Sequence, residues 1–99
     1  MLAQLKDLDQ QVLETALAFP EDVVGIRYSV GHDWSGDPAL FFRVLLSDEA
    51  SREEMLGDIT GRVSSKLFDD LQGRHSDYIP YFYFRSKSEQ DRLHDPEWP

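Results

Sequence analysis

Apolar residues recur at helical spacing in two segments of the chain, over residues 3–18 and over residues 51–73. The first stripe consists of Leu5, Leu8, Val12, Leu13, Ala16 and Leu17. The second consists of Met55, Leu56, Ile59, Val63, Leu67, Phe68 and Leu71. Pro20 ends the first segment, because a proline pushes the residue before it out of helical geometry. Ser51 and Glu54 form a capping box ahead of the second, so the pattern predicts two amphipathic helices.

Three further segments, residues 23–30, 39–47 and 78–86, are rich in apolar and aromatic residues that alternate between two faces. This composition and period predict strands, the first two joined as an antiparallel hairpin. The order helix, strand, strand, helix, strand predicts an α+β two-layer sandwich. Two helices would pack on one face of a three-stranded, mainly antiparallel sheet, and the other face would be open. We expect a single domain over residues 1–87 and a C-terminal tail over residues 88–99.

The composition is that of one soluble domain with an acidic surface. The chain has 99 residues, of which 40% are hydrophobic and 29% are charged, enough for one modest core. It has no cysteine, which excludes a disulfide framework and a thiolate zinc site. Residues 1–19 mix acids with apolar residues and predict neither a signal peptide nor a membrane span, so we expect a cytoplasmic protein. The net charge of −9 favours a basic partner over nucleic acid or an anionic membrane, or simply keeps a small protein soluble.

Charge placement separates the strands from the rest of the chain. The segments 23–30, 39–47 and 78–88 contain four basic residues and no acid, whereas the remainder has 19 acids against six bases, a net charge of −13. The alternation places Val24 on the helix-covered face and Val23 on the open face. It also places six residues on the open face: Arg27, Phe41, Arg43, Tyr81, Tyr83 and Arg85. Guanidinium groups pair with carboxylates or phosphates and aromatic rings supply rigid contact area, so we predict a binding face. The alternative is that each arginine stacks on a tyrosine and only stabilises the sheet.

Residues 30–42, VGHDWSGDPALFF, place a histidine, two aspartates and a tryptophan ahead of a hydrophobic strand. Glycine, aspartate and proline form turns, so we predict that residues 31–38 form the turn of the hairpin. Its candidate functional residues are His32, Asp33, Trp34 and Asp37. The alternative is a divalent metal site formed by His32, Asp33, Asp37 and Asp48, as in a small phosphotransfer or nuclease-type enzyme. We assign no catalytic residue and no cofactor.

Small size, acidity and a basic-aromatic face favour a non-catalytic binding or regulatory protein. Antitoxins, immunity proteins and accessory subunits are of this kind. We expect a basic protein partner, or self-association through the sheet face. The metal-dependent enzyme is the first alternative, and a binder of single-stranded nucleic acid that uses the sheet face is the second. The net charge argues against the second alternative.

Overall fold

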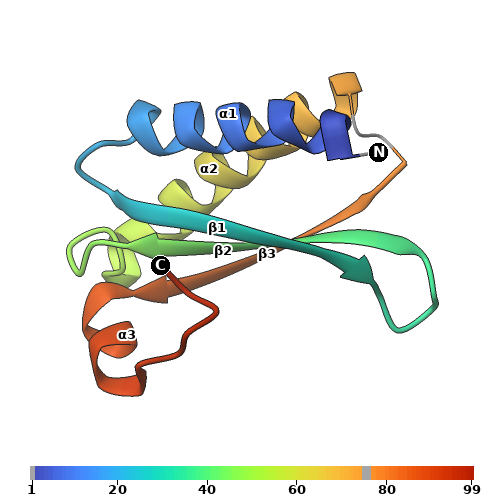
Figure 1. Ribbon diagram of the computed structural model, residues 1–99. Coiled ribbons are helices and arrows are strands. Elements are labelled where there is room, and N and C mark those ends of the chain that lie inside the picture. The colour runs from blue at the N-terminus through green and yellow to red at the C-terminus, as the bar shows by residue number, and fades with distance from the viewer. Residues whose placement is uncertain (1, 75–76) are drawn as a thin grey trace.

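Figure 1 shows the computed structural model of the chain, which describes residues 2–74 and 77–99, and side chains over residues 7–71 and 77–99. The elements follow the order α1 (Leu2–Ala18), β1 (Val23–His32), β2 (Pro38–Leu46), α2 (Glu53–Arg74), β3 (Ile79–Ser86) and α3 (Lys87–Leu93). The predicted α+β class is therefore confirmed. None of the described helices is long and apolar enough to cross a membrane.

The three strands form one sheet in the order β1-β2-β3. The β1–β2 pair is antiparallel, as expected for a hairpin, but the β2–β3 pair is parallel. The sheet is thus mixed, where the sequence predicted a mainly antiparallel one. The reason is the connection: helix α2 carries the chain back to the end at which β2 began, and parallel neighbours need such a crossover.

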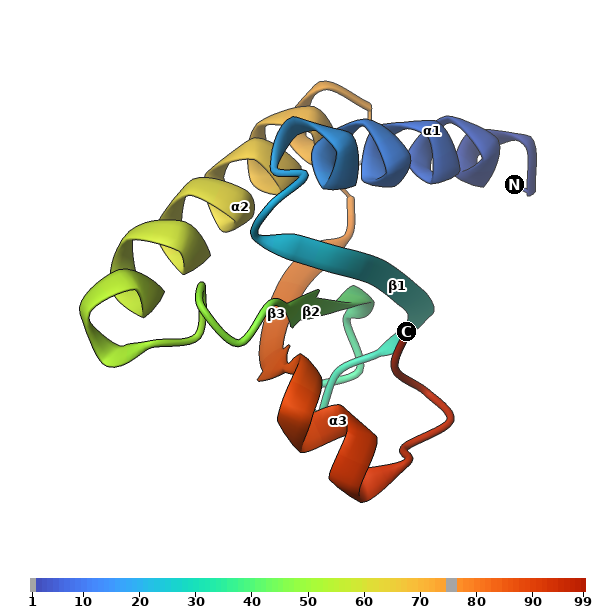
Figure 2. The same ribbon diagram turned by 90° about the vertical axis from the view of Figure 1, so that its left-hand side faces the viewer.

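The sheet is covered on both sides. Helices α1 and α2 lie on one face, and α3 with the last residues of the chain lies on the other (Figures 1 and 2). The expectation of an open second face is therefore wrong for the part that α3 and the chain end cover. Leu45, which the alternation also places on this face, is only 2% exposed. The division of the chain into a domain over residues 1–87 and a tail over residues 88–99 remains a prediction.

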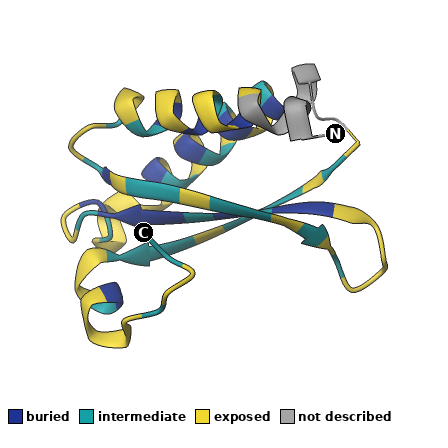
Figure 3. Cartoon of the chain, viewed as in Figure 1, coloured by how far each residue is buried: buried dark blue, intermediate teal, exposed yellow. Residues whose placement is uncertain are grey.

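The hydrophobic core lies between the sheet and helices α1 and α2. The central strand β2 contributes four side chains that are 0% exposed, Leu40, Phe42, Val44 and Leu46. The helices contribute the following buried residues: Leu8, Val12, Ile59, Val63, Leu67 and Leu71. Figure 3 shows the buried positions on the sheet-facing sides of the helices. These are members of the two predicted stripes, so helical periodicity identified the packing faces.

A β-bulge changes which side chain of β1 enters the core. Val23 pairs with Leu46 and Gly25 pairs with Leu45, so one extra residue lies between them. Val23 is buried at 6% exposure and Val24 is 51% exposed, the reverse of the predicted assignment. Strict alternation fails here because a bulge shifts the register by one residue and exchanges the two faces.

The predicted apolar stripes are wider than the surface that the sheet covers. On α1, Leu13 is 53% exposed and Leu17 is 67% exposed. On α2, Met55, Leu56 and Phe68 are 47%, 37% and 42% exposed. A three-stranded sheet is narrow, so the outer edge of each stripe remains in solvent.

Candidate functional site

The strand register brings the predicted basic and aromatic residues to one face of the sheet. Arg27 pairs with Arg43, and Arg43 pairs with Tyr83, which forms one row across all three strands. In a neighbouring row, Phe41 stacks on Tyr81 with ring centroids 5.4 Å apart. Arg85 adds the third guanidinium group from β3, and we call these six residues the basic-aromatic face. The arginines do not stack on tyrosines as the structural alternative proposed; their recorded partners lie elsewhere.

Most of those partners lie in the last six residues, 94–99, which we call the strap; Arg43 also donates to the Ser29 hydroxyl of β1 at 3.0 Å. The Arg27 guanidinium donates hydrogen bonds to the backbone carbonyls of Pro96 at 2.8 Å and Trp98 at 3.3 Å. The Arg43 guanidinium donates to the Glu97 carboxylate at 3.1 Å. Two of the three arginines thus hold the strap across β1 and β2.

Arg85 holds the start and the end of the strap. It donates to the Asp95 carboxylate at 3.5 Å and to the Gln90 side-chain oxygen of α3 at 2.8 Å. Its guanidinium carbon lies 4.2 Å from the centroid of the Trp98 ring, a cation–π contact. Gly25 permits the close approach of the chain end, because a Cβ atom there would lie 3.1 Å from Pro99 Cβ. The tail therefore docks on the sheet through charge and an aromatic ring.

Residues 33–37, between β1 and β2, form a turn organised by one carboxylate. Asp33 Oδ1 accepts hydrogen bonds from the backbone N–H groups of Ser35 and Asp37 and from the Ser35 hydroxyl, at 2.7–3.0 Å. Asp33 Oδ2 accepts from the Tyr81 hydroxyl at 2.8 Å, which ties the turn to β3. Gly36 supplies the left-handed conformation with φ +88°. The predicted turn is confirmed.

Hydrogen bonding holds the Asp33 carboxylate in its ionised form. The Ser35 hydroxyl first, and then the Tyr81 hydroxyl, lower the pKa of Asp33 to about 2. The same bond to Asp33 raises the pKa of Tyr81. Because four donors bind this carboxylate, the role of Asp33 is to stabilise the turn. The Trp34 side chain at the tip is 93% exposed, and His32 is also exposed.

The four candidate metal ligands do not converge, so that interpretation of the sequence is wrong. His32, Asp33 and Asp37 lie at one end of the β1–β2 hairpin, whereas Asp48 follows the opposite end of β2. The nine residues of β2 separate the two ends by about 30 Å at about 3.3 Å per residue. Asp48 accepts hydrogen bonds from the backbone N–H and the hydroxyl of Ser88, which lower its pKa. Among the described residues, no three His, Asp or Glu side chains are grouped to hold a metal ion.

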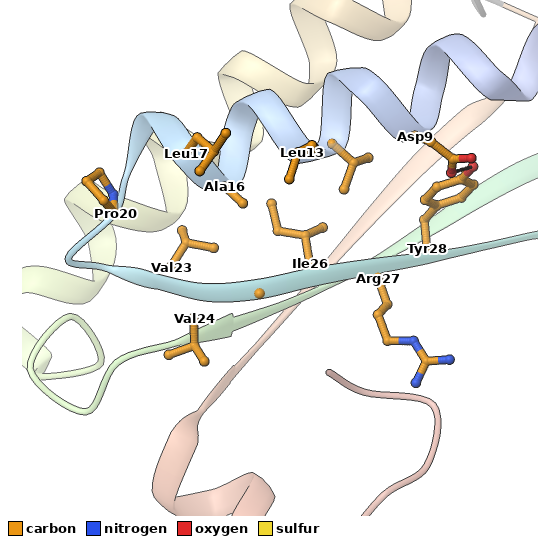
Figure 4. Close-up of a pocket in the computed structure, with 12 residues that line it drawn as sticks. Asp9, Leu13, Ala16, Leu17, Pro20, Val23, Val24, Ile26, Arg27 and Tyr28 are labelled. Atoms are coloured by element: carbon orange, nitrogen blue, oxygen red, sulfur yellow. Dashed lines mark hydrogen bonds between the residues drawn. The ribbon is translucent and has the colours of Figure 1, made fainter.

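A groove between α1 and β1 is the site that the sequence analysis missed. It has a volume of about 820 Å³ and runs along the free edge of the sheet. Leu13 and Leu17 from α1 and Val23 and Ile26 from β1 point into the same space (Figure 4). The sequence contains a sign of this groove, because the apolar stripe on α1 includes more residues than its contact with the sheet buries.

Acids outnumber bases in the two elements beside this groove. Residues 2–32 contain five acids and two bases, Lys6 and Arg27, and Arg27 both lines the groove and is bound to the strap. Asp9 lines the groove and accepts a hydrogen bond from the Tyr28 hydroxyl at 2.5 Å (Figure 4). Burial first, and then the bond to Asp9, raise the pKa of Tyr28 to about 12, so the phenol stays protonated and links β1 to α1.

A second groove, of about 900 Å³, lies between α2 and β3. Its lining is richer in polar side chains: Ser51, Glu53, Thr60, Ser64, Tyr83, Arg85, Ser86 and Glu89. The two sheet-edge grooves therefore differ in the residue types that line them.

Comparison of the chain with protein-family models, with curated proteins and with solved structures gives no match.

Proposed function

We propose that this chain is a non-catalytic binding protein, of the antitoxin, immunity-protein or accessory-subunit kind, that takes an extended segment of a basic protein partner in the α1–β1 groove. The observation that carries the proposal is an apolar groove beside an edge strand. Leu13 and Leu17 are more than half exposed there, and contiguous exposed apolar surface marks interaction sites.

The edge strand favours an extended partner segment. Strand β1 has a neighbouring strand on one side only. A peptide that adds to such an edge gains main-chain hydrogen bonds, and alternate side chains of the peptide enter the adjoining groove. Side chains that point toward α1 would contact Leu13 and Leu17.

Charge favours a basic partner and disfavours a second copy at this groove. The two elements and their connection carry five acids, and the whole chain has a net charge of −9. Two copies would bring these acids together, whereas lysines and arginines of a partner would neutralise them and speed association. A cytoplasmic location is part of the proposal, since a cysteine-free chain suits a reducing compartment.

The test uses a synthetic peptide in which lysine and valine alternate, so that one face is apolar and the other is basic. We expect NMR shift changes centred on residues 13–28. Leu17→Lys places a charge in the groove and should weaken binding about tenfold or more, the effect of losing about 1.4 kcal/mol. Leu93→Lys is the matched control, because Leu93 is 52% exposed on α3 and its substitution changes the net charge equally.

Equal loss of affinity in the two variants would show binding to the acidic surface in general and would contradict the proposal. The same conclusion would follow if a peptide of identical composition without the alternation bound as tightly.

A further inference from the structure

The basic-aromatic face is itself built to hold a peptide, and the strap is the peptide it holds. Each strand contributes one arginine to this contact. Arg27 recognises backbone carbonyls, which every extended segment presents. Arg43 recognises a carboxylate, and Arg85 recognises a second carboxylate together with an aromatic ring. The occupant is therefore acidic and aromatic, and it follows a turn between Asp95 and Trp98.

The strap is held by contacts that exchange readily. Glu97, the partner of Arg43, has a side chain that is 67% exposed, and Asp95 is 34% exposed. Each ion pair joins one of these carboxylates to a largely buried guanidinium group, since the Arg43 and Arg85 side chains are 18% and 17% exposed, so water competes chiefly for the carboxylate. The strap adds no strand to the sheet, and the backbone hydrogen bond recorded within it is a turn from Trp98 N–H to the Asp95 carbonyl at 3.2 Å.

The face extends beyond the part that the strap covers. A cavity of about 510 Å³ lies beside Trp98, lined by Ser29, Phe41, Arg43, Tyr83 and Arg85 among others. Tyr83 is 45% exposed and Val30 at the margin is 45% exposed. A segment longer than the strap would contact the rings of Phe41 and Tyr83 and the hydroxyl group of Ser29 in this cavity.

From these contacts we propose that the basic-aromatic face is a recognition site for a partner segment in which two carboxylates precede an aromatic residue, as Asp95 and Glu97 precede Trp98, and that the strap occupies this site until such a segment displaces it. Charge complementarity identifies the occupant. The guanidinium groups of Arg43 and Arg85 meet carboxylates in the strap, and an incoming segment has to supply the same groups. This site adjoins the α1–β1 groove at Arg27, which lines both, but it has the opposite charge preference, so neither proposal depends on the other.

The experiment measures the anisotropy of a fluorescein-labelled peptide with the sequence of residues 88–99, added to the full chain. The covalently attached strap competes at high effective concentration, so we expect weak binding to the unaltered chain. Glu97→Gln loosens the strap and should tighten peptide binding about threefold, the effect of removing one exposed ion pair. Arg43→Gln removes a contact from both strap and peptide and should weaken peptide binding. A peptide with Asn and Gln in place of its acids is the matched control.

Fluorescence of Trp98 reports displacement directly in a Trp34→Phe background, because the chain has two tryptophans. Saturating unlabelled peptide, made with Phe in place of its tryptophan, should shift this emission to the red as the ring leaves Arg85. Three results would overturn the proposal: equal binding of the neutral peptide, no effect of Glu97→Gln, or an unchanged Trp98 spectrum at saturation. Binding of labelled oligothymidylate to the Glu97→Gln chain, without binding of the peptide, would overturn it in favour of single-stranded nucleic acid.

Discussion

The two faces of the sheet are covered by different physical means. Toward α1 and α2, the cover is apolar, and Phe42 and Val44 are 0% exposed. Toward α3 and the strap, it depends on guanidinium groups that donate to carbonyl and carboxylate oxygens, some of them largely in solvent. Apolar burial stabilises in proportion to area, whereas exposed ion pairs contribute little. We therefore expect the first face to contribute most of the stability of the fold and the second to open at a lower cost.

The largest test of this comparison uses the adjacent residues Phe41 and Phe42, which lie on opposite faces. Phe42 stacks on Phe82 with ring centroids 5.4 Å apart inside the core. Phe42→Ala should lower the free energy of unfolding by about 3–5 kcal/mol, measured by urea denaturation followed by circular dichroism. Phe41→Ala should lower it by about half as much or less, because Phe41 is only partly buried. Equal losses would mean that the two faces contribute alike.

A smaller effect is expected from the strap, and the two tryptophans make a matched pair. Trp98→Ala removes the ring from Arg85 and should lower the free energy of unfolding by about 1 kcal/mol. Trp34→Ala should leave it unchanged, since that side chain is 93% exposed. Thermal unfolding of both variants measures the difference. If Trp98→Ala lowered the free energy of unfolding by more than about 3 kcal/mol, the strap would be part of the core of the fold. This result would contradict the proposal that a partner segment displaces the strap.

The smallest effect is expected at the turn and depends on pH. The pKa of Asp33 is lowered to about 2 from an ordinary value of 3.8, so the folded state favours the ionised carboxylate. This contribution to stability is present above about pH 4 and is lost as the pH falls through 3.8 toward 2. Asp33→Asn should remove that part of the acid dependence, measured by urea unfolding at several pH values between 2 and 5. Asp69→Asn, at an exposed position of α2, is the control and should retain the slope. An unchanged slope in Asp33→Asn would show that the turn carboxylate is not coupled to folding.

The sequence predicted the helix-covered face well because that information is local. Helical spacing marked Val63 and Leu67, and alternation marked Phe42 and Val44, each within a few residues of the next. The turn was predictable for the same reason, since Asp33 organises groups only two and four residues away. The bulge between Val23 and Gly25 was not, because two valines in succession are compatible with either register.

The candidate site could be predicted only in part. Alternation placed Arg27, Arg43 and Arg85 on one face, and the strand register agrees. Nothing local links Arg43 to Glu97, which is 54 residues away in the chain. The separation of basic strands from an acidic remainder was the available signal, and it pointed to an outside partner as readily as to the tail.

By itself, the sequence determined the class of the fold, the apolar faces of its helices and strands, the turn at Asp33 and the separation of charge. These features follow from side-chain periodicity and from hydrogen bonds between near neighbours. Only the tertiary structure decided that β3 runs parallel to β2, that Asp48 binds Ser88 of α3 far from Asp33, and that the strap lies on the arginines. Those outcomes depend on where α2 and α3 carry the chain, and they bring together groups that no local pattern relates.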